Sequence, residues 1–176
     1  LSANTEQAQI WFRRAADQSL PAAMYNLGIM NLRGEIDPGT EQQALVWLQQ
    51  AADVGHDVAA LTIAQIHLSH ADKPERLKVA ATKFRELAEA NYLDAQINLG
   101  MMFTFGQGVE QNFDEGRFWL ERAASQGSSQ AQLNLGNIYV EGLGVERDLQ
   151  QAYAWYAISA LNGEVAAESN RDLISA

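Results

Sequence analysis

The sequence predicts an all-α protein, an α/α solenoid in which antiparallel helix pairs wind into a right-handed superhelix. Three observations lead to this fold class: residue types recur every 36 residues, apolar residues within each repeat are spaced three and four apart, and no segment alternates as a strand would. A period of this length is typical of stacked supersecondary units that bury their apolar faces against one another. We therefore expect about ten helices, two in each full repeat.

The 36-residue period is carried by several registers at once, each repeating one type of residue. They are the small residues Ala23, Ala59, Ala95, Ala131 and Ala167, the aliphatic residues Leu27, Ile63, Leu99 and Leu135, and the tryptophans Trp11, Trp47, Trp119 and Trp155. Only Lys83 interrupts the tryptophan register. Agreement in several registers indicates one continuous array, so we expect a single repeat domain over residues 1–176.

The array begins with an incomplete unit. Residues 1–19 match only the second helix of a repeat, with Trp11, Ala15 and Ala16 in place, and residues 20–55 form the first full repeat. The missing first helix suggests either further repeat sequence upstream or an N-terminal cap. The chain opens on Leu1 and not on Met, and we therefore expect it to be a processed or trimmed product. The loop 35–39 of the first full repeat lacks the glycine–valine pattern of the later repeats.

Residues 56–91 form the most divergent repeat. His67 replaces an aromatic residue, His70 replaces a glycine and Lys83 replaces a tryptophan. His67, His70 and Asp72 could mimic a small metal site, or the histidines could simply be replacements in a degenerate repeat. No further ligand that would complete a zinc site is evident, so we expect no metal and no cofactor.

The repeats 92–127 and 128–163 are the most regular. Gly106 and Gly142 follow the first helix of each and are expected to end it, since glycine tolerates positive φ. Asp114 and Asp148 lie near the start of the second helix, where an acidic residue complements the helix dipole. Residues 164–176 resemble a closing helix with a more polar surface, as expected of a C-terminal capping helix.

A small residue follows the aliphatic residue of each repeat, as Gly100 follows Leu99. We expect it to let the paired helices approach and to leave room for an indole ring of the partner helix. Trp47, Trp119 and Trp155 are then core residues. The alternative is that they bind a ligand, but their repetition at one register favours the core.

The repeats resemble the Sel-one-like repeat (SLR) family, a branch of the tetratricopeptide-like helical repeat superfamily. The 128–163 repeat fits that family's unit at Ala131, Leu135, Gly136, Tyr139, Gly142, Gly144, Val145, Asp148, Ala152, Trp155, Ala160 and Gly163. The resemblance implies a solenoid whose first helices line a concave groove, with the residue before each leucine facing that groove.

That implied groove supplies the candidate site. The expected partner-binding residues are Tyr25, Asn26, Ile29, Thr62, Gln65, Ile97, Asn98, Met101, Leu133, Asn134 and Asn137. Asparagine amides both donate and accept hydrogen bonds, so they could hold the backbone of an extended peptide. Alternatively, the asparagines could bond to neighbouring repeats and stabilise the superhelix.

Composition narrows the possible partners. The formal charge is −10 with only 12 Lys and Arg, which argues against nucleic acid and favours a neutral or basic partner. No apolar run approaches the roughly 18–20 residues of a membrane span, so we expect no membrane insertion. The chain contains no cysteine, which excludes disulfides and thiolate chemistry. The compartment, whether cytoplasm or bacterial periplasm, and the oligomeric state stay open.

The sequence does not indicate an enzyme. It contains no Gly-x-Ser-x-Gly elbow, no His-Glu-x-x-His motif and no Ser-x-x-Lys motif. We expect a protein–protein interaction scaffold or adaptor that binds a protein or peptide in the concave groove. The alternatives are a cell-envelope protein with a peptidoglycan- or polysaccharide-related role, since the SLR family is common in bacterial envelopes, and a structural spacer within a larger assembly.

Overall fold

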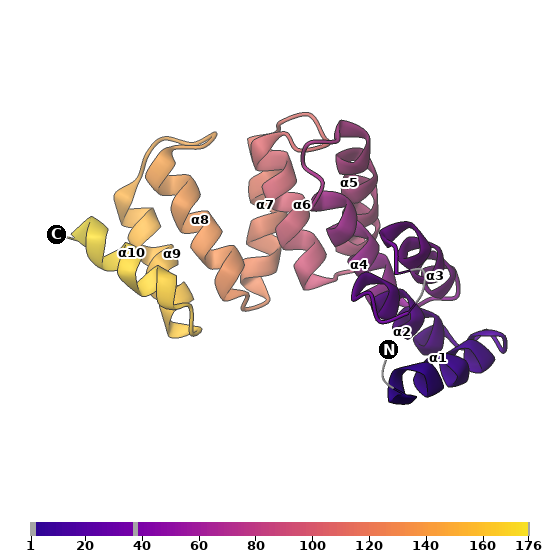
Figure 1. Ribbon diagram of the computed structural model, residues 1–176. Helices are drawn as coiled ribbons and strands as arrows, with labels where there is room; N and C mark the ends of the chain where they lie inside the picture. Colours follow the sequence, from indigo (N-terminus) through magenta and orange to yellow (C-terminus); the bar gives the residue numbers. More distant parts are fainter. Residues whose placement is uncertain (1–2, 37–38, 176) are drawn as a thin grey trace. The chain divides into compact units, whose positions relative to one another are not determined.

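The structure, a computed structural model, describes residues 3–36 and 39–175. Leu1, Ser2, Asp37, Pro38 and Ala176 lie outside the described residues, and with them part of the divergent loop 35–39. Within the described ranges all regular structure is helical, in ten helices (Figure 1). This confirms the all-α class and the number of helices expected from the sequence.

The chain divides into two compact units, Leu1–Ser69 and His70–Ala176. Unit 1 contains α1 (Ala3–Ala16), α2 (Pro21–Leu32), α3 (Glu41–Asp53) and α4 (Asp57–Leu68). Unit 2 contains α5 (Pro74–Glu89), α6 (Leu93–Phe105), α7 (Phe113–Ser125), α8 (Ser129–Glu141), α9 (Leu149–Leu161) and α10 (Val165–Ser175). The division falls inside the 56–91 repeat, which is the most divergent in sequence. The single-domain organisation stays a prediction.

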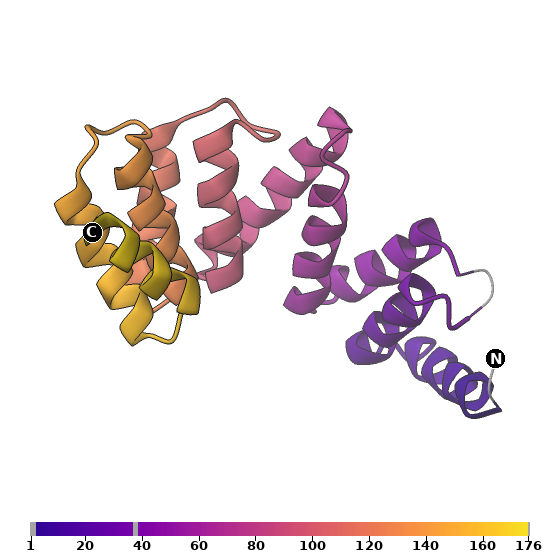
Figure 2. The same cartoon turned by 60° about the vertical axis from the view of Figure 1, so that its left-hand side comes forward.

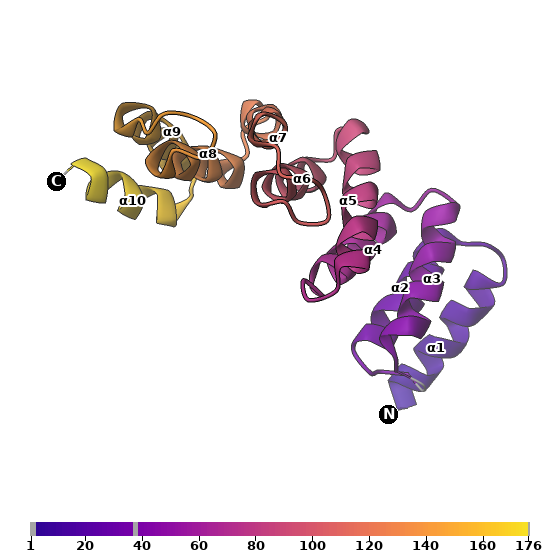
Figure 3. The same cartoon turned by 90° about the horizontal axis from the view of Figure 1, so that it is seen from above.

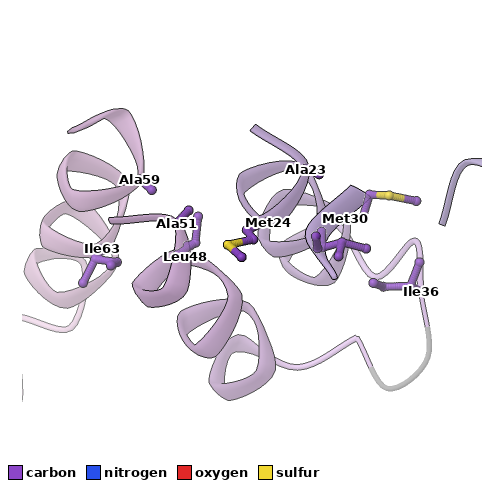
Figure 4. Close-up of a cluster of buried hydrophobic side chains, with 10 residues drawn as sticks. Ala23, Met24, Met30, Ile36, Leu48, Ala51, Ala59 and Ile63 are labelled. Atoms are coloured by element: carbon purple, nitrogen blue, oxygen red, sulfur yellow. The ribbon is translucent and has the colours of Figure 1, made fainter. Parts of the chain in front are cut away.

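Unit 1 is built on the helix pair α2 and α3, with α1 packed against α2 and α4 against α3. Its core is one apolar cluster to which all these helices contribute. Figure 4 shows Met24 of α2, Leu48 and Ala51 of α3, and Ile63 of α4 within this cluster. Burial of these side chains provides the main driving force for packing the helices, since none forms a stable helix alone at this length.

Unit 2 contains the helix pairs α6–α7 and α8–α9, with α5 packed on α6, α7 on α8, and α10 on α9. Viewed from above, the first helices α6, α8 and α10 lie along one side, and the second helices α7 and α9 lie along the other (Figure 3). The antiparallel pairs therefore form two layers. The first-helix layer is the one to which the sequence assigned the groove.

The ends of these helices follow from local chemistry. The side chains of Asn112 and Asp148 accept hydrogen bonds from backbone N–H groups in the first turns of α7 and α9, which satisfies donors that a helix start leaves unpaired. Gly106 and Gly142 end α6 and α8 with φ of 67° and 70°, as expected from the sequence. The loops that follow α6 and α8 therefore leave from the same end of unit 2 (Figure 2).

The small residues of the repeat do allow close approach, but they do not face an indole. A Cβ atom at Gly100 would lie 2.8 Å from Leu120 Cγ and 3.0 Å from the Gly116 carbonyl oxygen. At Gly136 the obstructing side chain is Tyr156. The prediction of an indole wedge was therefore wrong by one residue: Leu120 and Tyr156 follow the tryptophans, and one residue turns the side chain by about 100° around the helix.

The tryptophans differ in burial. Trp119 is 5% exposed, which confirms it as a core residue, whereas Trp47 and Trp155 are only partly buried. Trp11, in the same register on α1, is 59% exposed and has the Arg14 guanidinium 5.1 Å from its ring centre. Position in the repeat thus does not determine burial, which also depends on the neighbouring helices.

Candidate functional site

Three of the expected groove residues meet in a hollow on the first-helix layer of unit 2. Met101 of α6 and Asn134 and Asn137 of α8 line a recess of ≈ 70 Å³. The rest of its lining is Thr104, Phe105, Ile138, Glu141 and Leu143. We call this recess the α6/α8 hollow. It combines aliphatic walls with two amide groups and one carboxylate.

Phe105 is a residue of this hollow that the sequence analysis missed. It is the last residue of α6, and 51% of it is exposed. The 36-residue period places Ser69 and Glu141 at the equivalent positions. A large aromatic residue where the other repeats carry polar residues was a signal that the sequence already contained.

The asparagines of this face form their hydrogen bonds locally. Asn98 Nδ2 donates to the Asp94 carbonyl oxygen at 2.8 Å, and Asn134 Oδ1 accepts from Gln130 Nε2 at 3.5 Å. Asn137 Oδ1 accepts from the Tyr156 hydroxyl at 2.7 Å, within the same repeat. The hydrogen bonds between neighbouring repeats, which were the alternative role for these asparagines, are formed by other residues.

Two buried glutamines join the repeats of unit 2. Gln96 and Gln132 donate through Nε2 to the Ala88 and Ala124 carbonyl oxygens at 3.3 and 3.1 Å. Their Oε1 atoms accept from Gln126 Nε2 at 2.7 Å and Asn162 Nδ2 at 2.9 Å. Both glutamines are almost fully buried. We call this arrangement the glutamine ladder, and its period of 36 residues was visible in the sequence.

Leu133 and Ile97 were also expected in the groove, but their side chains contribute to packing. Leu133 is buried in a cluster with Ala152, Tyr156 and Ala167 of α9 and α10. Ile97 is partly buried against the cluster that contains Leu135. Leu133 is therefore not available to a partner.

The five expected residues of unit 1 lie on α2 and α4. The Tyr25 ring stacks on the His56 ring with centres 4.8 Å apart, and the Thr62 hydroxyl donates to the Val58 carbonyl at 2.7 Å. Gln65 is exposed. Asn26 and Ile29 line a separate hollow of ≈ 300 Å³ between α1 and α2. The structure thus does not gather these five residues into one recess.

Larger recesses occur away from the expected residues. One in unit 1, of ≈ 430 Å³, is lined by α3 and α4 residues including Leu45, Val46 and Ile63. One in unit 2, of ≈ 570 Å³, contains Glu110, Glu115 and Arg85, whose guanidinium lies 5.1 Å from the centre of the Phe103 ring. Neither brings first helices together, so size alone does not identify a groove.

His67 lies on α4, and His70 opens unit 2. Among the residues that the structure describes, no group of three His, Cys, Asp or Glu side chains could hold a metal ion. Over the same residues, none of the helices combines the length and the apolar character needed to cross a bilayer.

Antiparallel helix pairs that recur every 36 residues define an α-helical repeat protein. The profile of the Sel1 repeat matches residues 1–20, 21–56, 93–128 and 129–164. The chain therefore belongs to the Sel1 repeat family, which confirms the resemblance to Sel-one-like repeats. The intervening residues 57–92 correspond to the divergent repeat. No curated protein matches the chain.

Solved structures support the same assignment. The chain is 32% identical, with a TM-score of 0.81, to c5321, a protective antigen of uropathogenic Escherichia coli strains with an SLR fold, over 95% of this chain and 36% of that one. It is 27% identical to a Sel1 repeat protein from Oxalobacter formigenes, with a TM-score of 0.78 over 96% of this chain and 70% of that one. The immunity protein Pa5087 of Pseudomonas aeruginosa, at 19% identity, TM-score 0.52 and coverage of 95% and 69%, shares the fold alone.

These neighbours are bacterial, which suggests a bacterial origin for this chain. The chain spans about a third of the length of c5321. Proteins built of Sel1 repeats generally mediate protein–protein interactions, and the repeat is a non-catalytic scaffold fold.

Proposed function

We propose that this protein is an interaction scaffold whose unit 2 binds a protein or peptide at the α6/α8 hollow. The observation that carries the proposal is the meeting of Met101, Asn134 and Asn137 from two successive first helices, beside the exposed Phe105. Exposed aromatic residues next to a polar rim are characteristic of protein-binding surfaces.

The chemistry of the hollow favours a particular kind of partner. Its walls are aliphatic and aromatic, its amides can bond a peptide backbone, and its one charged group is the Glu141 carboxylate. The formal charge of the whole chain is −10. A neutral or basic segment is therefore favoured over an acidic one.

Site-specific photo-crosslinking tests this proposal, because Phe105 has a matched control. Phe118 on α7 is 52% exposed, against 51% for Phe105, but it lies on the second-helix layer. A benzoylphenylalanine residue would replace each in turn, and the labelled proteins would be irradiated in extract of the native cell. We expect a discrete protein adduct from position 105 and none from position 118.

The same experiment distinguishes the remaining functions. A protein that carries both the label at position 105 and the substitution Met101→Glu should give no adduct, since the added carboxylate would oppose burial of an apolar partner group. Equal adducts from positions 105 and 118 would refute binding at this hollow. A purely structural spacer predicts no adduct at 105, whereas an envelope polysaccharide role predicts binding to isolated glycan without a protein adduct.

A further inference from the structure

Tyr156 connects three helices beneath the α6/α8 hollow. It lies on α9, is almost fully buried, and its ring packs on Gly136 of α8. Its hydroxyl donates to Asn137 Oδ1 at 2.7 Å, and its ring belongs to the buried cluster that also contains Ala167 of α10. Tyr156 is therefore the contact through which α9 and α10 reach a residue of the hollow.

Burial raises the pKa of Tyr156, so at neutral pH the phenol keeps its proton. The hydroxyl hydrogen is therefore present and is donated to Asn137 Oδ1.

This arrangement orients the Asn137 amide. Its oxygen accepts from Tyr156, so its two N–H donors are directed away from that bond and can face the hollow that Asn137 lines. An amide held on one side loses less rotational freedom when a ligand accepts from the other side, because part of the ordering cost is already met.

The arrangement occurs in only one of the two regular repeats. The positions 36 residues earlier are Leu120 and Met101, which have neither a hydroxyl nor an amide. General repeat packing therefore does not require a polar pair here. Leu120 packs against Gly100 as Tyr156 packs against Gly136, so the ring alone would satisfy the core.

The hollow also limits the size and charge of what it can hold. Its volume of ≈ 70 Å³ is well below the roughly 150 Å³ of a cavity that encloses a benzene ring. The hollow therefore favours a small aliphatic side chain over an aromatic ring. The carboxylate of Glu141 in the lining favours a neighbouring cation.

We propose that Tyr156 and Asn137 form a relay, in which the tyrosine hydroxyl holds the Asn137 amide as a donor to a backbone carbonyl of an extended, basic peptide, whose small aliphatic side chain enters the hollow. The proposal rests on the proposed function of this face. Tyr156 is a positioning residue: it does not touch the peptide but orients the group that does.

The test uses a matched pair of substitutions on α9. Tyr156→Phe keeps the ring against Gly136 and removes the hydroxyl, whereas Tyr153→Phe makes the same change at an exposed position. The first readout needs no ligand: ¹⁵N relaxation of the Asn137 side-chain amide in the free protein. We expect a restricted amide in the parent and in Tyr153→Phe, and a mobile one in Tyr156→Phe.

The second readout is titration with defined peptides. The probe is acetyl-Lys-Val-Lys-amide, and the comparison peptides carry Trp in place of Val or Glu in place of both Lys residues. We expect the parent and Tyr153→Phe to prefer the probe, and Tyr156→Phe to bind it roughly 3–10-fold more weakly, the effect of losing one well-placed hydrogen bond. Unchanged melting of Tyr156→Phe would show that this loss is not a folding defect.

The outcomes separate this inference from the proposed function. Probe binding with equal affinity and equal amide order in Tyr156→Phe and the parent would overturn the relay and leave the binding face in place. Absence of probe binding by the parent would also overturn the relay. In that case the adduct at position 105 decides separately whether the face binds proteins at all.

Discussion

Replacing Trp119 with alanine should strongly destabilise unit 2, whereas the same change at Trp11 should not. The two residues occupy the same register of the repeat, but Trp119 is 5% exposed and Trp11 is 59% exposed. The pair therefore matches residue type and position in the repeat and differs strongly in burial.

The magnitude follows from the area removed from water. A buried tryptophan covers about 150–250 Å², which at about 25 cal/mol per Å² corresponds to roughly 4–6 kcal/mol as an upper estimate. Measured losses for such truncations are about 3–5 kcal/mol, and we expect Trp119→Ala to fall in that range. Trp11→Ala removes less than half of that buried area and leaves no enclosed cavity, so the same conversion gives an upper estimate of roughly 2–3 kcal/mol and we expect a clearly smaller loss than at Trp119.

Urea unfolding followed by far-ultraviolet circular dichroism measures this difference without relying on tryptophan fluorescence. Because the chain contains two compact units, two transitions can occur, and Trp119→Ala should shift the one that belongs to unit 2. Similar small shifts of the midpoint for the two variants would refute the argument that neighbouring helices bury Trp119.

Three further predictions concern unit 2. Gly100→Leu should cost at least about 1–3 kcal/mol in thermal melts, because even a Cβ there would crowd Leu120 and the α7 backbone. Gln132→Leu should cost about 1–3 kcal/mol in urea titrations, since it removes the buried donor to the Ala124 carbonyl oxygen and the acceptor of Asn162 Nδ2; Gln130→Leu, at an exposed position, is the control. The raised pKa of Tyr156 means that the folded state keeps the phenolic proton to a higher pH than the unfolded state does. Stability should therefore fall as pH rises above about 10, and stability measured against pH should show a smaller alkaline loss for Tyr156→Phe.

Much of the fold could be predicted from the sequence because the period and the helix-ending residues are local signals. Gly106 and Gly142 end α6 and α8 as expected, and Asp148 caps α9. Which side chain meets the small residue could not be read from spacing alone. Trp119 and Leu120 are neighbours in sequence, and only the rotation of α7 against α6 decides that Leu120 faces Gly100.

The candidate site was predicted less completely. Met101, Asn134 and Asn137 come together, but Leu133 is covered by α9 and α10, whose packing the repeat pattern does not specify. Phe105 was not predicted because no other repeat has an aromatic residue at the equivalent position, so the repeat pattern does not mark it. Gln96 and Gln132 do recur at the 36-residue period, but polar residues are seldom expected to be buried, so their role in the core was not predicted.

The glutamine ladder bears on how the length of such an array can change. Gln96 and Gln132 have backbone acceptors 36 residues apart, at Ala88 and Ala124. Duplication or excision of one whole 36-residue module would give every buried amide an equivalent acceptor, whereas insertion of a single residue would rotate one away and strand it in the core. Selection against stranded amides would thus favour variation in whole modules, with the number of repeats changing more readily than their size.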